Sequence, residues 1–133
     1  EVAASSYQQA LRIDKNHAMA HMQLGTLFGR SGNDAKALHH FGEAVRVLPN
    51  SPRAHNNYAT ANFAANKLDV AERHYRSALA LQPSYFNAQF NLARVLLGMG
   101  RKDAARKELK RAAELRPREP AVQQLLQQLG SGK

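Results

Sequence analysis

Hydrophobic and small residues recur in this chain at two spacings, three or four residues within short segments and 34 residues from one segment to the next. Around Phe41, the residues Ala37, Ala44 and Leu48 continue one face of a helix. The columns kept through the chain are Ala3, Ala37, Ala71 and Ala105; Tyr7, Phe41, Tyr75 and Leu109; Ala10, Ala44, Ala78 and Ala112; and Leu24, Tyr58 and Leu92. A period of this length predicts a repeat protein whose unit is a pair of helices.

Residues that interrupt helices follow the same period. Gly32 and Gly100 stand in mid-period, where glycine can take a positive φ without steric cost, and Asn66 is the best substitute for it there. Prolines, which discourage continuation of a helix, follow the second helix of three units at Pro49, Pro83 and Pro117. The middle unit is therefore predicted to form helices over Pro52–Ala65 and Leu68–Leu81, and the whole chain seven or eight antiparallel helices without strands.

The 133 residues divide into units with partial units at the ends. A lone helix pair cannot bury its apolar face, whereas stacked pairs share one core, so we predict one all-α domain, a solenoid, over residues 1–133. Its parts are the second helix of a partial repeat at 1–17, full repeats at 18–51, 52–85 and 86–119, a terminal or capping helix at 120–129, and a flexible tail at 130–133.

These columns resemble the tetratricopeptide repeat family over nearly the whole chain. The resemblance implies a right-handed superhelix, with a concave groove lined by the first helix of each pair. It also implies a role in binding proteins or peptides. Two family columns differ in this sequence: the fourth repeat position holds His21, His55 and Gln89 where Trp is common, and the eleventh holds Phe28, Asn62 and Leu96 where Tyr is common. Because Asn62 is polar at a usually buried place, looser packing is expected around it.

Family geometry places the sixth repeat position, occupied by Gln23, Asn57 and Asn91, on the concave groove. An amide offers a donor and an acceptor, so it can pair with an extended peptide backbone without reading its sequence. The spacing resembles the amide ladder in the repeat superhelix of the O-GlcNAc transferases. The alternative is that these amides only solvate the groove or cap a nearby carbonyl.

The resemblance places further residues on the groove, where amides, arginines and apolar side chains mix. They are Met19, Met22, Thr26, Arg30, Arg53, Asn56, Thr60, Ala64, Asn87, Phe90, Arg94 and Leu97. This surface suits a peptide or partner helix with some acidic character. It does not reproduce the carboxylate clamp by which family members bind chaperone tails, because only Asn57 matches the clamp residues. A receptor for chaperone tails is therefore not expected.

The charge balance favours anionic partners: 19 Lys and Arg against 10 Asp and Glu give a net charge of +9. Lys102, Arg106 and Lys110 form a basic stripe at helical spacing on a second helix, which family geometry turns away from the groove. The stripe is either a solvated outer face or an anion patch. No aromatic residues interleave it for stacking on bases, so nucleic acid is the less favoured partner.

Catalytic and metal chemistry have little support. No cysteine is present, and no serine elbow or glycine-rich phosphate loop occurs. His21 and His55 are repeat equivalents, as are His40 and His74, and equivalent side chains lie roughly 10 Å apart. Zinc ligands must lie within about 2.1 Å of the metal. We therefore predict histidines at helix seams, no metal, no cofactor and no enzyme activity in this segment.

Both ends of the chain are predicted to carry apolar residues that no full repeat covers. Val2, Tyr7 and Leu11 lie in a half repeat whose first helix would have covered them, so self-association through this end is expected. The chain starts inside a repeat, and we interpret it as an excised segment. The compartment is left open, with the cytoplasm slightly favoured. The longest apolar stretches have only a few residues, so no bilayer-spanning segment is expected. In the tail, an apolar stripe either closes the core or seeds association: Leu125, Leu126 and Leu129.

Three functions remain open at this stage. The leading one is a protein-interaction scaffold that binds a peptide or helix in the groove. The second is a substrate-recognition arm of a larger enzyme such as a glycosyltransferase. The third is a basic module that binds nucleic acid or another polyanion.

Overall fold

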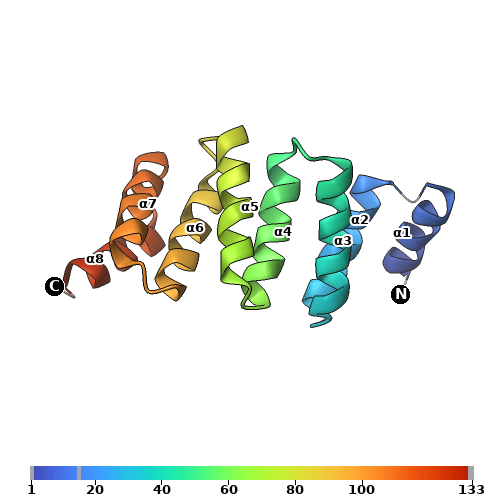
Figure 1. The fold of residues 1–133 in the computed structure, drawn as a ribbon, viewed down its shortest axis with the longest axis horizontal. Coiled ribbons are helices and arrows are strands. Elements are labelled where there is room, and N and C mark those ends of the chain that lie inside the picture. Colours follow the sequence, from blue (N-terminus) through green and yellow to red (C-terminus); the bar gives the residue numbers. More distant parts are fainter. Residues whose placement is uncertain (1, 15, 132–133) are drawn as a thin grey trace.

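The computed structural model describes residues 2–14 and 16–131, and these residues form eight α-helices and no strand. The helices lie side by side in chain order, from α1 at one end to α8 at the other (Figure 1). Their bounds are α1 Val2–Ile13, α2 Ala18–Arg30, α3 Asp34–Val47, α4 Pro52–Ala64, α5 Leu68–Leu81, α6 Phe86–Gly98, α7 Lys102–Leu115 and α8 Pro120–Ser131. The predicted all-α solenoid is confirmed.

The helix bounds agree closely with the sequence pattern. In the middle unit, α4 ends one residue before the predicted end and α5 has the predicted bounds. The last helix runs to Ser131, past the predicted end at Leu129, so the first half of the predicted tail is helical. The other half, residues 132 and 133, lies outside the described residues.

The turn inside each helix pair is closed by a left-handed residue. Gly32, Asn66 and Gly100 have φ values of 82°, 61° and 78°. In each case the next residue donates its N–H to a carbonyl five positions back, at 2.8–2.9 Å, as Lys67 does to Asn62. This is the Schellman arrangement, which satisfies carbonyls that the helix end leaves without partners. The predicted turns are therefore confirmed.

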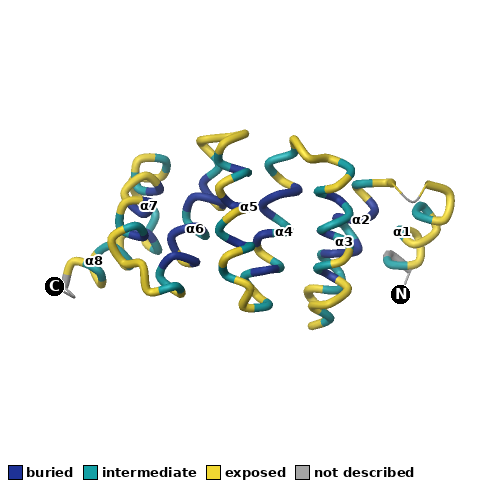
Figure 2. Tube along the Cα trace, viewed as in Figure 1, coloured by how far each residue is buried: buried dark blue, intermediate teal, exposed yellow. Residues whose placement is uncertain are grey.

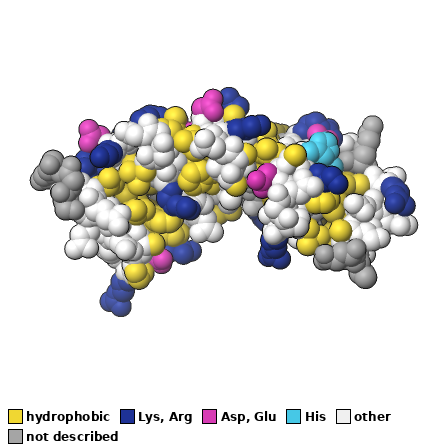
Figure 3. Space-filling model, turned by 90° about the horizontal axis from the view of Figure 1, so that it is seen from below, with side chains coloured by type: hydrophobic (Ala, Val, Ile, Leu, Met, Phe, Trp, Pro, Cys, Tyr) yellow, Lys and Arg dark blue, Asp and Glu magenta, His cyan; other side chains and the backbone are white. Residues whose placement is uncertain are grey.

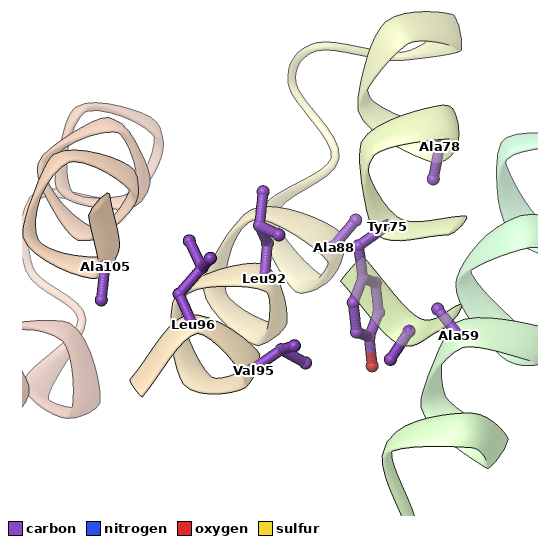
Figure 4. Close-up of a cluster of buried hydrophobic side chains, with 9 residues drawn as sticks. Ala59, Tyr75, Ala78, Ala88, Leu92, Val95, Leu96 and Ala105 are labelled. Atoms are coloured by element: carbon purple, nitrogen blue, oxygen red, sulfur yellow. The ribbon is translucent and has the colours of Figure 1, made fainter. Parts of the chain in front are cut away.

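The core runs along the stack of helices between the exposed outer faces (Figure 2). Its central part joins α4, α5 and α6, where Tyr75 is fully buried and Ala71 and Ala78 allow the helices close approach. Figure 4 shows Tyr75 of α5 beside Leu92 and Val95 of α6. The Tyr75 hydroxyl lies 2.8 Å from Thr60 Oγ1, which gives the buried polar atom a partner.

The two ends differ. On α8, the predicted apolar stripe of Leu125, Leu126 and Leu129 packs against the cluster around Phe86 and Leu109, which closes the core of the third repeat. On α1, Tyr7 and Leu11 are half-buried, and the side chain of Val2 lies outside the described residues. The predicted association through α1 stays a prediction.

Candidate functional site

A hollow of about 450 Å³ lies between α2 and α4, with α3 beneath it; we call it the α2–α4 hollow. It brings together six of the predicted groove residues: Thr26, Arg30, Asn56, Asn57, Thr60 and Ala64. Gly25, Gly29, Asp34, Ala37, Phe41 and Ala61 complete the lining. The first helices of neighbouring pairs therefore form an open surface, as the resemblance implied for this side of the chain.

Close packing of α2 on α3 sets the floor of the hollow. A Cβ added to Gly25 would lie 2.7–2.8 Å from the ring of Phe41, closer than real side-chain contacts. Because Gly25 has no side chain, the Phe41 ring can pack directly against the backbone of α2, where the ring is buried. This requirement explains why a helix interior tolerates a residue of poor helix propensity.

The three ladder amides are half-buried, and two of them make only weak side-chain contacts. Gln23 Nε2 contacts Met19 Sδ at 3.7 Å, and Asn57 Nδ2 contacts a second thioether at 3.8 Å. Thioethers are weak acceptors. Asn91 Oδ1 accepts a hydrogen bond from Arg94 Nη1 at 3.2 Å. Gln23 and Asn57 in particular could exchange these weak contacts for the backbone of a ligand.

Other predicted groove residues are already engaged by the protein. Thr26 and Thr60 donate their hydroxyls to backbone carbonyls four residues earlier, at 3.0 and 2.9 Å. Met22 and Asn56 are buried, with exposed fractions of 4% and 9%. The Asn56 Oδ1 atom has no partner in the described part of the chain. Met22 and Asn56 therefore form the base of the surface, whereas Thr26 is half-buried and Thr60 is exposed.

The remaining predicted groove residues lie farther along the same helices. Met19, Arg53, Asn87 and Arg94 are exposed, whereas Leu97 is half-buried. Phe90 is half-buried and stacks on Phe86, with ring centroids 5.9 Å apart. Ala64 is exposed at the edge of the α2–α4 hollow.

Charge is distributed unevenly between first and second helices. α2, α4 and α6 contain Arg30, Arg53 and Arg94 and no Asp or Glu. Asp34, at the start of α3, is the only acidic residue that lines the α2–α4 hollow. Figure 3 shows the molecule from below Figure 1, with hydrophobic patches and scattered Lys and Arg side chains. The surface of the first helices therefore has a positive potential suited to anionic ligands.

The histidines pair within a repeat rather than between repeats. His21 Nδ1 lies 3.0 Å from His40 Nδ1, and His55 Nδ1 lies 3.0 Å from His74 Nδ1. His55 Nε2 is 2.7 Å from the carbonyl of Pro49. Burial is the main cause that lowers the pKa of His40 and of His74 from 6.5 to about 4. The prediction of histidines at helix seams is correct, but these contacts were missed.

In the third full repeat, Gln89 and Glu108 stand at the positions that the paired histidines occupy in the first two. Gln89 Nε2 donates to Glu108 Oε1 at 2.8 Å, and Arg111 Nη1 donates to the same oxygen at 3.0 Å. All three pairs span 19 residues, a regularity in the sequence that could have revealed them. A hollow of about 690 Å³ lies beside Glu108, but its two arginines and two glutamates balance in charge.

The basic stripe lies on α7, and its members differ in what they contact. Arg106 donates to Asp103 Oδ1 at 2.9 Å and to the carbonyl of Leu129 on α8 at 3.2 Å. Lys102 and Lys110 are exposed. Part of the stripe therefore holds the last helix in place.

Two further features of the described residues bear on function. No group of three or more His, Asp or Glu side chains is placed to hold a metal ion within residues 2–14 and 16–131. Over the same ranges, every helix is too short or too polar to cross a lipid bilayer.

Sequence comparison identifies two overlapping matches. Models of the tetratricopeptide repeat match residues 62–129 and residues 22–84, so the first of them covers just over half of the chain. No curated protein matches the chain in sequence.

Solved structures share the fold at low identity. The crystal structure of MamA has a TM-score of 0.92 at 22% identity, covering 97% of this chain and 75% of that one. The first TPR of Spaghetti (RPAP3), bound to the HSP90 peptide SRMEEVD, has a TM-score of 0.80 at 24% identity and covers 86% and 93%. The Arabidopsis OM64 TPR domain has a TM-score of 0.83 at 16% identity and covers 87% and 96%.

Proposed function

Because this chain belongs to the tetratricopeptide repeat family, we propose that it is a protein-interaction module. Its ligand is an extended peptide or a partner helix that lies across α2, α4 and α6. The RPAP3 domain of similar fold is bound to a peptide, which supports this class of ligand.

The observation that carries the proposal is the open surface of the first helices. It combines the α2–α4 hollow with two half-buried amides, Gln23 and Asn57, that make only thioether contacts. Amides in this state can accept and donate hydrogen bonds to a peptide backbone at little cost to the protein. Arg30, Arg53 and Arg94 add positive charge, which favours ligands with acidic residues.

Selection from a phage-displayed library of random peptides tests the proposal. The Gln23→Ala/Asn57→Ala variant should bind the selected peptides more weakly and keep its fold. Loss of two neutral hydrogen bonds, about 0.5–1.5 kcal/mol each, corresponds to a roughly 5- to 150-fold weaker affinity.

The control is Lys102→Glu/Lys110→Glu, which reverses charge in the basic stripe and spares Arg106, since that side chain bonds to α8. This control should change mainly the salt dependence of binding. Normal binding by the amide variant, together with loss of binding by the stripe variant, would place the ligand on α7. It would then favour the polyanion function.

A further inference from the structure

One residue that lines the α2–α4 hollow is much smaller than its equivalents in the later repeats. Gly29 stands one 34-residue period before Phe63 and two before Leu97. Phe63 and Leu97 are half-buried and pack against the central core cluster. The first full repeat has a glycine where the next two have a large apolar side chain.

Packing within the chain does not require this glycine. A Cβ at Gly29 would meet only Ala37 Cβ, at an ordinary distance of 3.9 Å, and the backbone φ there is not positive. Gly25, one helical turn earlier, is by contrast required by the ring of Phe41. Glycine weakens a helix relative to alanine. Gly29 therefore has a cost in helix stability without a packing benefit, and its effect is to keep the hollow open.

The next repeat shows what fills the equivalent place. The guanidinium carbon of Arg94 lies 5.2 Å from the centroid of the Phe63 ring, a cation–π contact. The equivalent positions in the first junction are Gly29 and Thr60. Both the ring and the cation are thus replaced by smaller side chains, and the hollow is lined by alanines and Phe41 instead.

Polar groups around this floor are suited to an acidic chain. Arg30 forms no ion pair with any residue in the described ranges. Asn57 lines the hollow and contacts only the Met22 thioether. A guanidinium without a carboxylate partner can pair with a ligand carboxylate, and the amide can hold the adjacent backbone.

We infer that the α2–α4 hollow is a specificity pocket for one bulky apolar side chain, phenylalanine or leucine, carried by an acidic peptide. The ligand side chain takes the place that Phe63 and Leu97 occupy in the following repeats. This inference rests on the proposed function and adds to it the residue that the surface selects.

The probes are fluorescein-labelled heptapeptides in which every residue except the central one is Asp or Glu. The central residue is Phe, Leu, Ala or Lys, and binding is measured by fluorescence polarisation at low salt. Burial of a Phe or Leu side chain should give a Kd about 10- to 100-fold lower than that of the Ala peptide. The Lys peptide should bind more weakly than the Phe and Leu peptides because its ammonium would have to enter an apolar pocket.

Gly29→Phe is the decisive variant, because it supplies from the chain itself the side chain that the ligand would insert. Its melting temperature should equal or exceed the wild-type value, and its preference for the Phe and Leu peptides should disappear. Gly130→Phe is the matched control, since a Cβ there meets nothing within 4 Å. This control should keep the preference. Should Gly29→Phe fail to fold, Gly29→Leu, which copies Leu97, gives the same reading.

Each outcome separates the inference from the proposed function. Equal affinity for all four peptides overturns the pocket and leaves a groove that binds acidic peptides. Absence of binding by all four up to about 1 mM, the range of very weak complexes, also overturns it. The library selection then decides the proposed function independently. Self-association abolished by Gly29→Phe would identify a second copy as the occupant and contradict the inference.

Discussion

Acidification should destabilise this fold through its two histidine pairs. The pair of His55 and His74 shows the reason most clearly. Because His55 Nε2 donates to the Pro49 carbonyl, its Nδ1 is an acceptor, and His74 Nδ1 must carry the proton between the two rings. If both histidines were protonated, two N–H donors would face each other across 3.0 Å. The folded state therefore disfavours the fully charged pair.

The sign of the effect follows from the pKa values. The pKa of His74 falls from 6.5 to about 4, first through burial, then through His55 and Arg73. Burial likewise dominates for His40, followed by His21 and His39, and opposed by Glu43. Between pH 6.5 and about 4, His40 and His74 are protonated in the unfolded chain but remain neutral in the folded chain. The free energy of unfolding therefore falls as the pH falls through this window.

The magnitude is moderate because the rings of His40 and His74 are only partly buried. A fall in pKa from 6.5 to about 4 would correspond to roughly 3 kcal/mol at full strength, but solvent screening reduces it to about 1–2 kcal/mol per pair. Both pairs together should lower the free energy of unfolding by about 2–4 kcal/mol near pH 4 relative to neutral pH.

The assay is urea unfolding followed by far-UV circular dichroism at several pH values across this window. Replacing both pairs by glutamine, as His21→Gln/His40→Gln and His55→Gln/His74→Gln, keeps a donor and an acceptor at each place without a titrating group. At neutral pH the variant should lie within about 1 kcal/mol of the wild type for each pair. A parallel loss of stability in both proteins on acidification would refute the reasoning, because the carboxylates would then account for all of it.

Three other predictions concern packing within the fold and association through its first helix. Ala71→Leu should destabilise the fold by about 1–3 kcal/mol through overpacking, measured by urea unfolding, and a neutral result would contradict the close helix contact. Gly25→Ala should destabilise the fold by about 1–3 kcal/mol because it clashes with an aromatic ring, whereas Gly29→Ala should stabilise it by up to about 1 kcal/mol; thermal unfolding of the two variants should shift in opposite directions. Association through the face of α1 that carries Tyr7 and Leu11 should appear in sedimentation as a concentration-dependent mass, and a strict monomer at high concentration would rule it out.

The helices and turns were predictable because their causes are local and periodic. A left-handed residue is needed wherever the chain reverses, and Gly32, Asn66 and Gly100 meet that need without reference to the rest of the fold. The small residues Ala71 and Ala78 reveal close helix contacts because nothing larger fits there. Such constraints show in each repeat separately, so the period displays them several times.

The candidate site was less predictable, because its properties come from differences between repeats. Alignment of the repeats places Gly29 in the same column as Phe63. Only the structure shows that a side chain at position 29 would not clash with its neighbours. Likewise, family geometry placed Met22 on the groove, whereas its burial depends on contacts with Ala44 and Ala54 from two other helices. A period describes what repeats share, and binding specificity depends on what they do not share.

The pair of Gln89 and Glu108 replaces a histidine pair in the third full repeat, and this replacement depends on nearby arginines. Glu108 is buried, yet its carboxylate lies 3.0 Å from Arg111 and 3.9 Å from Arg76. One period earlier, the residues in those two arginine positions are Ser77 and Gly42. A carboxylate in place of His74 would therefore lack the two arginines that accompany Glu108, and a partly buried carboxylate without them is harder to stabilise than a neutral imidazole. The change from histidine to glutamate in the third repeat is thus tied to the arginines that accompany it, which explains why one place in the fold uses two chemistries.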